Sequence, residues 1–106
     1  MTRAKLTNMR KGGLFDPELK ERPVLIVGTR SRGERILVIP GSGSSPSYRY
    51  TKTLHPSQYP FLRKPSTFLC DHMQYQRDDE LAYPLGFVTM EDLDMIISLA
   101  DAAIQD

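Results

Sequence analysis

Three polar positions stand beside short apolar runs of the sequence, where a folded sheet would present them at its edge. Arg22 precedes one run, Ser42 follows the next inside the glycine–serine sequence 41–45, and Asp71 closes a third. The glycines on either side of Ser42 allow its hydroxyl and the nearby backbone N–H groups to form a small anion-binding nest. Each position also has a structural interpretation: a solvated arginine, a flexible hairpin loop and a strand-terminal cap.

Several other kinds of site are disfavoured. The two histidines, His55 and His72, have no Cys, His or carboxylate partner at a metal-ligand spacing, so we expect no metal and no cofactor. No nucleophile elbow is present, and the sequence 41–45 lacks the spacing of a nucleotide-binding P-loop. Cys70 is the single cysteine and is interpreted as a small buried hydrophobic residue.

The charge of the chain is unevenly distributed. Among its 106 residues, residues 1–70 hold 13 basic and 4 acidic side chains, whereas residues 71–106 hold 1 basic and 9 acidic. The basic excess in residues 1–70 indicates binding of a polyanion. The uneven distribution excludes a protein that is uniformly basic or uniformly acidic. One cysteine cannot form an intrachain disulfide, and neither a secretory signal nor a membrane-length apolar run is present. We therefore expect a cytoplasmic protein with no membrane partner.

Two apolar runs predict the centre of the fold. Residues 23–27 and 36–39 are apolar at every position and rich in β-branched residues, and a glycine-bounded loop joins them. They predict an antiparallel strand pair with both faces covered. Pro23 is expected to begin the first strand and Pro40 to end the second.

Further elements follow along the chain. Residues 48–54 alternate weakly and predict an exposed edge strand, and residues 66–71 predict a third buried strand. Residues 75–85 are polar and precede Gly86. The three prolines at 56–65 divide the intervening segment into short pieces.

The last element is a helix with an acidic first turn. Thr89 is its predicted N-cap, and Glu91 and Asp92 follow it. Its apolar face at helical spacing comprises Leu93, Ile96, Ile97, Ala100, Ala103 and Ile104. The elements together predict a mainly β protein, a small curled antiparallel domain closed by a C-terminal helix. Residues 11–106 are assigned to this single domain and residues 1–10 to a basic N-terminal segment, for which disorder is an open alternative.

Four motifs follow one another along the chain. They are Arg22-Pro-Val-Leu-Ile-Val27, Val38-Ile-Pro-Gly-Ser42, Lys64-Pro-Ser-Thr-Phe-Leu-Cys-Asp71 and Leu85-Gly-Phe-Val-Thr-Met-Glu-Asp-Leu93. Their order resembles the MazF/PemK (Kid-like) family of type II toxin–antitoxin toxins, whose pattern has an RPV strand, a strand ending in P-x-(T/S), a strand ending in CDQ or ADQ, and an (I/L)G segment before a terminal helix. The resemblance covers about residues 11–104.

The resemblance implies a small SH3-like antiparallel β-barrel with a C-terminal helix, acting as a homodimer. The implied activity is that of an endoribonuclease that cleaves single-stranded mRNA without a metal, through attack by the 2′-OH. The implied partners are single-stranded RNA and a cognate antitoxin protein. By position, Arg22 matches the arginine of the RP step, Ser42 matches the residue after the strand-ending proline, and Asp71 matches the aspartate of the CDQ step.

These residues have the chemistry that such a reaction needs. Arg22 would hold the non-bridging phosphate oxygens, and because its guanidinium stays charged its role is electrostatic. Ser42 and the backbone of Gly41 and Gly43 would donate hydrogen bonds to the phosphate. Asp71 is the candidate base or the group that orients Arg22. The residues expected to line the RNA groove, for backbone contacts, base stacking or proton transfer, are Tyr48, Arg49, Tyr50, Lys52 and His72.

The chain departs from the family pattern near its N-terminus. Residues 12–17 are too few for the full first strand of the family, and residues 18–21 replace a loop that in the family contains an EQ pair. Asp71 is followed by His72 where the family has glutamine. A second hypothesis therefore stays open: a non-catalytic relative that uses the same barrel to bind nucleic acid or protein.

Overall fold

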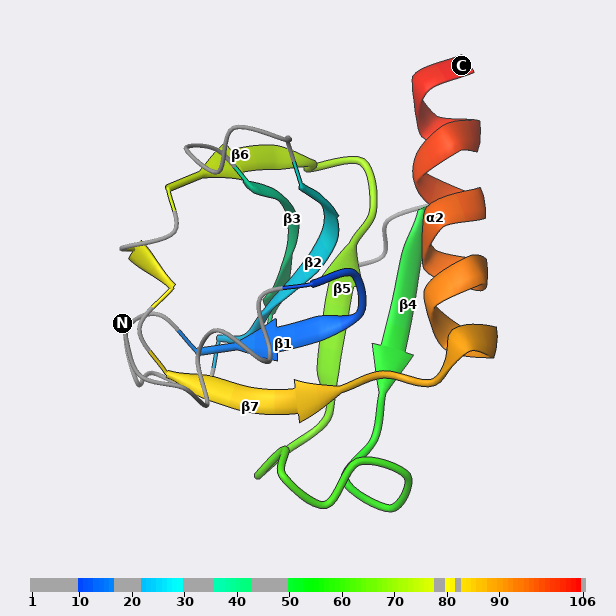
Figure 1. Ribbon diagram of the computed structural model, residues 1–106. Helices are drawn as coiled ribbons and strands as arrows, with labels where there is room; N and C mark the ends of the chain where they lie inside the picture. Colours follow the sequence, from blue (N-terminus) through cyan, green and yellow to red (C-terminus); the bar gives the residue numbers. More distant parts are fainter. Residues whose placement is uncertain are drawn as a thin grey trace.

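The computed structural model describes the chain in separate stretches, within which it forms the sheet and the helix shown in Figure 1. The stretches are residues 10–16, 22–29, 36–42, 50–77, 80–81 and 83–105. The elements are β1 (Gly13–Phe15), β2 (Val24–Thr29), β3 (Ile36–Ser42), β4 (Thr51–Leu54), β5 (Ser66–Leu69), β6 (Gln74–Gln76), β7 (Pro84–Phe87) and α2 (Met90–Gln105). Within these stretches, no helix has the length and apolar character needed to cross a membrane.

The strands form one curled antiparallel sheet, and the helix lies at its side. The strand order is β4-β5-β3-β2-β1-β7, and β6 pairs with the first half of β3. α2 runs beside the edge strand β4, as Figure 1 shows. The mainly β fold with one C-terminal helix is confirmed, and so is the antiparallel pairing of β2 with β3.

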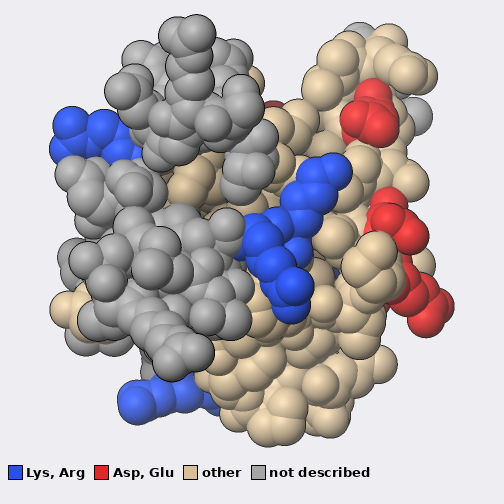
Figure 2. Space-filling model, in the orientation of Figure 1, with Lys and Arg blue, Asp and Glu red and all other residues tan. Residues whose placement is uncertain are grey.

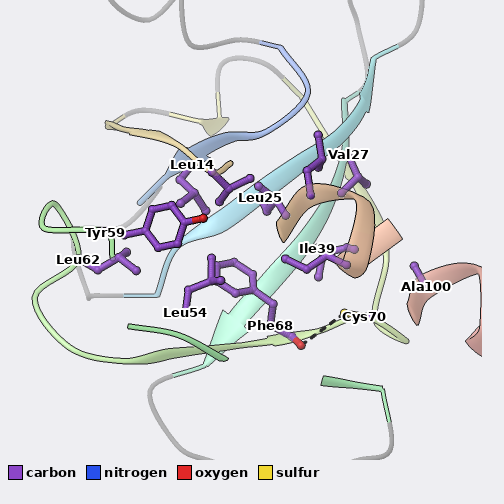
Figure 3. Close-up of a cluster of buried hydrophobic side chains, with 13 residues drawn as sticks. Leu14, Leu25, Val27, Ile39, Leu54, Tyr59, Leu62, Phe68, Cys70 and Ala100 are labelled. Carbon is purple, nitrogen blue, oxygen red and sulfur yellow. Dashed lines mark hydrogen bonds between the residues drawn. The ribbon is translucent and has the colours of Figure 1, made fainter. Parts of the chain in front are cut away.

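Side chains of β2 and β3 alternate between two hydrophobic cores. Leu25 and Ile39 point into a main core, drawn in Figure 3, that also contains Phe68 and the buried face of α2. The other face of the same strands is covered by a second core made of Phe15, Val24, Ile26, Ile36, Val38 and Leu81. Because both faces of these strands are buried, neither run can alternate with polar residues. The prediction of two covered faces is confirmed.

β3 continues through Pro40 to Ser42, so the prediction that Pro40 ends the strand is wrong. Successive N–H groups of a strand point to opposite edges. The N–H of Gly41 donates to β2, at the carbonyl of Pro23, so the nitrogen of Pro40 faces the other edge. At that edge the pairing with β6 has ended at Val38, and the pairing with β5 begins only at Gly41. A missing N–H at this point therefore removes no ladder bond.

The predicted edge strand and third buried strand are both present, but their ends differ from the predicted ranges 48–54 and 66–71. β4 is an edge strand as predicted, and β5 ends at Leu69 because a turn follows, in which the N–H of His72 donates to the carbonyl of Leu69 over 2.9 Å. The polar segment 75–85 contains most of β6 and the start of β7. These short strands take their conformation from their partners β3 and β1.

α2 begins and packs largely as predicted. The hydroxyl of Thr89 accepts the N–H of Asp92 over 3.2 Å, which is the expected N-cap bond, and the buried residues of the helix are Leu93, Ile96 and Ala100. Ile104 is 69% exposed, so its assignment to the buried face is wrong. Figure 1 gives the reason, because the C-terminal end of α2 extends past the N-terminal end of β4. In Figure 2 the acidic side chains in view lie along α2 and basic side chains lie over the sheet.

Candidate functional site

Arg22 and Ser42 lie at the same end of the β2–β3 pair. The N–H of Gly41 donates to the carbonyl of Pro23 over 2.7 Å, which sets these two residues opposite each other. The same register, continued by one residue, sets Arg22 opposite Ser42, and opposite residues share one face of a sheet. Arg22 is exposed and Ser42 is half-buried. The chain thus brings a cation and a hydroxyl to one position, as a phosphate site requires.

Gly41 serves the packing of this end of the sheet. Its N–H is engaged with Pro23, so this donor is part of the ladder and does not contribute to the anion nest expected around Ser42. A Cβ at Gly41 would lie 2.8 Å from the carbonyl oxygen of Pro23 and 3.3 Å from the ring of Phe68. The glycine therefore allows β2 to approach β3 closely enough to set Arg22 beside Ser42.

Replacing Gly41 by alanine is expected to lower the free energy of unfolding by about 1–3 kcal/mol, because the added methyl group overlaps backbone as well as a buried ring. Urea denaturation measures the change. The matched control is Gly28→Ala in β2, where the nearest atom to the added Cβ is Leu37 Cβ at 3.6 Å, an ordinary contact. Equal effects of the two substitutions would contradict the packing role of Gly41.

Two threonine hydroxyls that are not among the predicted site residues lie beside Ser42. Thr67 of β5 is the Cα partner of Ser42, and Thr53 of β4 is the partner of Thr67 on its other side. The two threonine hydroxyls are 2.9 Å apart and form a hydrogen bond. Their sequence signal is weak, because isolated threonines are ordinary strand residues.

Asp71 and His72 lie on the turn that follows β5. Thr67, the partner of Ser42, is four residues before Asp71, so the carboxylate stands farther along the sheet than the Arg22–Ser42 position. Asp71 Oδ1 lies 3.7 Å from His72 Nε2, and both side chains are exposed to solvent. The structure brings Arg22 and Ser42 together and sets Asp71 and His72 apart from them as a second polar pair.

Cys70 is fully buried between the main core and the Asp71 turn, as its interpretation as a small hydrophobic residue predicts. Its thiol lies 3.7 Å from the carbonyl oxygen of Phe68, the contact dashed in Figure 3. Burial, and to a lesser degree the negative charge of Asp71, raises the pKa of the Cys70 thiol from 9.0 to about 11. The thiol is therefore protonated at neutral pH and does not act as a nucleophile.

The stability of the protein is expected to fall between pH 9 and pH 11 because of this thiol. Below pH 9 Cys70 is protonated in both states, whereas above it the unfolded chain loses a proton that the folded chain keeps until about pH 11. The loss approaches about 3 kcal/mol of unfolding free energy. Urea denaturation from pH 8 to 11, compared with Cys70→Ala, measures it. A constant difference between the two proteins across this range would contradict the expectation.

The residues expected to line the RNA groove do not all lie beside Ser42. The Nζ atom of Lys52 lies 4.0 Å from Asp92 Oδ1 at the start of α2, and the ring of Tyr50 packs against the main core. Gly43, Tyr48 and Arg49 lie outside the described residues.

A polar cluster joins the start of α2 to Tyr59, in the turn segment between β4 and β5. The hydroxyl of Tyr59 donates to Asp92 Oδ2 and accepts the N–H of Thr89 over 3.1 Å. Burial, and then the hydrogen bond to Asp92, raises the pKa of Tyr59. Lys52 is thereby held toward the helix, on the face opposite the Arg22–Ser42 position, because its Cα partner Phe68 points into the main core. Among the described residues, no three His, Cys, Asp or Glu side chains are grouped as a metal site.

Comparison by sequence finds no relative, since no protein-family profile and no curated protein matches the chain. Comparison by structure finds many. An endoribonuclease from a mycobacterial species superimposes with a TM-score of 0.75 at 19% identity, over 92% of each chain. The Mycobacterium tuberculosis toxin MazF-mt6 gives 0.70 at 19% identity, over 88% of this chain and 96% of the toxin.

A third solved structure shows a related fold bound to a partner. It is a mycobacterial endoribonuclease in complex with its cognate antitoxin, with a TM-score of 0.71 and 18% identity, over 92% of this chain and 94% of that one. The matches extend over the sheet and the helix alike. The resemblance seen in the motif order is confirmed at the level of architecture, and the chain has the fold of the MazF toxins.

Proposed function

We propose that the protein is the toxin of a type II toxin–antitoxin system and cleaves single-stranded mRNA as a metal-independent endoribonuclease. The observation that carries the proposal is the position of Arg22 opposite Ser42, at the end of the β2–β3 pair in a sheet of MazF architecture. A ribonuclease without a metal needs fixed donors around the phosphate that is attacked. These two side chains are such donors.

In the proposed reaction the 2′-OH of one nucleotide attacks the adjacent phosphorus and displaces the 5′-oxygen of the next. A 2′,3′-cyclic phosphate and a 5′-OH are the products. Arg22 holds the non-bridging oxygens and stabilises the charge that develops on them in the transition state. Ser42 donates its hydroxyl to the same phosphate. Because the N–H of Gly41 is engaged with Pro23, the backbone donor we propose here is that of Gly43.

The proposed groups for proton transfer are Asp71, as base or as the residue that orients Arg22, and His72 beside it. To act as a base, Asp71 must come within about 3 Å of the 2′-OH in the RNA complex. Because the attacking 2′-OH lies about 3–3.5 Å from the phosphorus held at Ser42, this role requires the turn after β5 to bring Asp71 beside that phosphate in the RNA complex.

The proposed RNA path uses basic and aromatic residues of the segment 48–52, which leads into β4. Tyr48 and Arg49 precede β4 and supply stacking and a cation to the groove. Tyr50 and Lys52 are assigned to the same path, although the core and Asp92 already engage them in the absence of RNA. We expect them to contribute less than Arg49.

The proposed partners follow from the same reasoning. The solved complex of a mycobacterial endoribonuclease with its cognate antitoxin supports an antitoxin as a partner of this chain as well. We propose that the toxin acts as a homodimer in the cytoplasm, where its mRNA substrate is found.

Expression in a bacterial host tests the proposal. Induction of the protein should arrest growth and deplete mRNA, and co-expression of the antitoxin, encoded by a neighbouring small gene, should restore growth. Induction of the Arg22→Ala variant to the same level should leave growth unchanged. Growth arrest of equal strength by this variant, or normal growth with the unaltered protein, would overturn the proposal.

The second candidate is a non-catalytic module that binds nucleic acid or protein with the same sheet. The short β1 favours it, because β1 spans only Gly13–Phe15 and the family places a full first strand and its loop beside the site. This function predicts RNA binding that weakens with salt, without turnover and without growth arrest.

A further inference from the structure

The face of β2 and β3 that covers the second core changes character at one end. Val24 and Ile26 of β2, and Ile36 and Val38 of β3, are buried apolar residues on this face. Continuing along the same face, past Pro40 opposite Val24, the register leads to Arg22 and Ser42, and the neighbours of Ser42 on β5 and β4 are Thr67 and Thr53. We call this band of side chains the hydroxyl row. It consists of Arg22 followed by three hydroxyl residues, Ser42, Thr67 and Thr53.

The row crosses four neighbouring segments of the chain at nearly right angles to them. Strands lie about 4.8 Å apart, so Thr53 stands about 10 Å from Ser42 on the same face. Ser42 and Thr67 are Cα partners, as are Thr67 and Thr53. A strand of RNA held at Ser42 thus reaches Thr53 through a nucleotide next to the cleaved one.

Thr67 is the most buried residue of the hydroxyl row, and a hydrogen bond holds its side chain. It is 4% exposed, and a buried hydroxyl is costly unless it is hydrogen-bonded. Its bond to the hydroxyl of Thr53 satisfies this need and sets the rotamer of Thr53. Thr53 is half-buried on the edge strand β4, so it is the member of the threonine pair that keeps exposed surface.

We propose that Thr53 binds the ribose 2′-OH of a nucleotide adjacent to the cleaved one, and that Thr67 is a positioning residue that holds Thr53. The inference rests on the proposed ribonuclease function. A threonine hydroxyl both donates and accepts, as does the 2′-OH, whereas a DNA strand offers no such group at that position. The row therefore gives the site a preference for RNA beyond the nucleotide whose own 2′-OH attacks.

The test uses a short single-stranded RNA with one cleavage site, and a series of copies in which one flanking nucleotide at a time is 2′-deoxy. For the unaltered protein, one of these copies should lose about 5- to 10-fold in kcat/KM, the effect of one neutral hydrogen bond. Thr53→Val should lose the same factor on the all-RNA substrate and then be insensitive to that deoxy substitution. Thr53→Ser, which keeps the hydroxyl, should behave as the unaltered protein.

Two further variants complete the test. Thr67→Val should lower the deoxy sensitivity, and Thr67→Ser should restore it, with urea denaturation showing that both proteins are folded. Thr51→Val, on the same strand and face but opposite Leu69, is the matched control and should keep full sensitivity. Cleavage with no position sensitive to deoxy substitution, or Thr53→Val retaining that sensitivity, overturns this inference alone. Failure of the unaltered protein to cleave the all-RNA substrate overturns the ribonuclease proposal and this inference with it.

Discussion

Replacing Arg22 by alanine is expected to lower kcat/KM for RNA cleavage by about 10²–10³-fold, the loss observed when one preorganised donor to a developing oxyanion is removed. In the proposed reaction the charge on the phosphate oxygens grows as the 2′-OH attacks, so we expect Arg22 to interact more strongly with the transition state than with the bound substrate. Arg22→Lys should recover only part of the loss, because an ammonium cannot bind two oxygens in the fork geometry of a guanidinium.

The control for this substitution is Arg77→Ala. Arg77 is also an exposed arginine, it follows β6, and its Nε atom lies 3.8 Å from Glu80. Cleavage should change less than about two-fold, because Arg77 lies beyond the opposite end of β3 from Ser42. Equal losses for the two arginines would mean that Arg22 contributes only to general attraction of RNA.

Replacing Ile96 by alanine is expected to lower the unfolding free energy by about 2–5 kcal/mol, a large part of the stability of a small domain. Ile96 is completely buried and belongs to the main core together with Leu93 and Ala100 of the same helix. Its removal leaves a cavity between α2 and the sheet. Thermal or urea denaturation measures the loss.

Ile104→Ala is the matched control on the same helix. Ile104 is 69% exposed, and the same chemical change should alter stability by about 0.5 kcal/mol or less. A loss at Ile104 comparable with that at Ile96 would show that the end of α2 is covered in solution, and would contradict its position past β4.

The sequence is sufficient to predict the centre of the fold. The runs at 23–27 and 36–39 are apolar at every position because two cores enclose them, and this pattern alone predicts both strands and their covered faces. The N-cap at Thr89 and the spacing of Leu93, Ile96 and Ala100 likewise predict the helix and its buried side. These signals are local and repeated, so they survive in one sequence.

Other features depend on contacts that no local pattern encodes. β1 and β6 have three residues each and exist through pairing with β2, β3 and β7, so they carry no periodic signal. The extension of β3 past Pro40 depends on a gap between two partner strands, and the exposure of Ile104 depends on where the sheet ends.

Some residues of the candidate site can be predicted from the sequence, whereas others need the strand register. Arg22 and Ser42 could be proposed from motif order, and the β2–β3 register sets them opposite each other. The hydroxyl row needed the register of β3, β4 and β5, because Thr53 and Thr67 are ordinary strand residues when taken alone. Asp71 could be assigned from its motif, but its distance along the sheet from Ser42 follows only from the turn after β5.

Cleavage by Arg22 and Ser42 without a metal is most sharply distinguished by the chemistry of the RNA ends. Purified protein is incubated with a 5′-labelled single-stranded RNA in excess EDTA, and the 3′ ends of the fragments are identified. Cleavage by Arg22 and Ser42 predicts 2′,3′-cyclic phosphate ends in EDTA, with their rate lowered at least about 100-fold in both Arg22→Ala and Ser42→Ala. Intact RNA, fragments with 3′-OH ends, or cleavage unaffected by either substitution would contradict it.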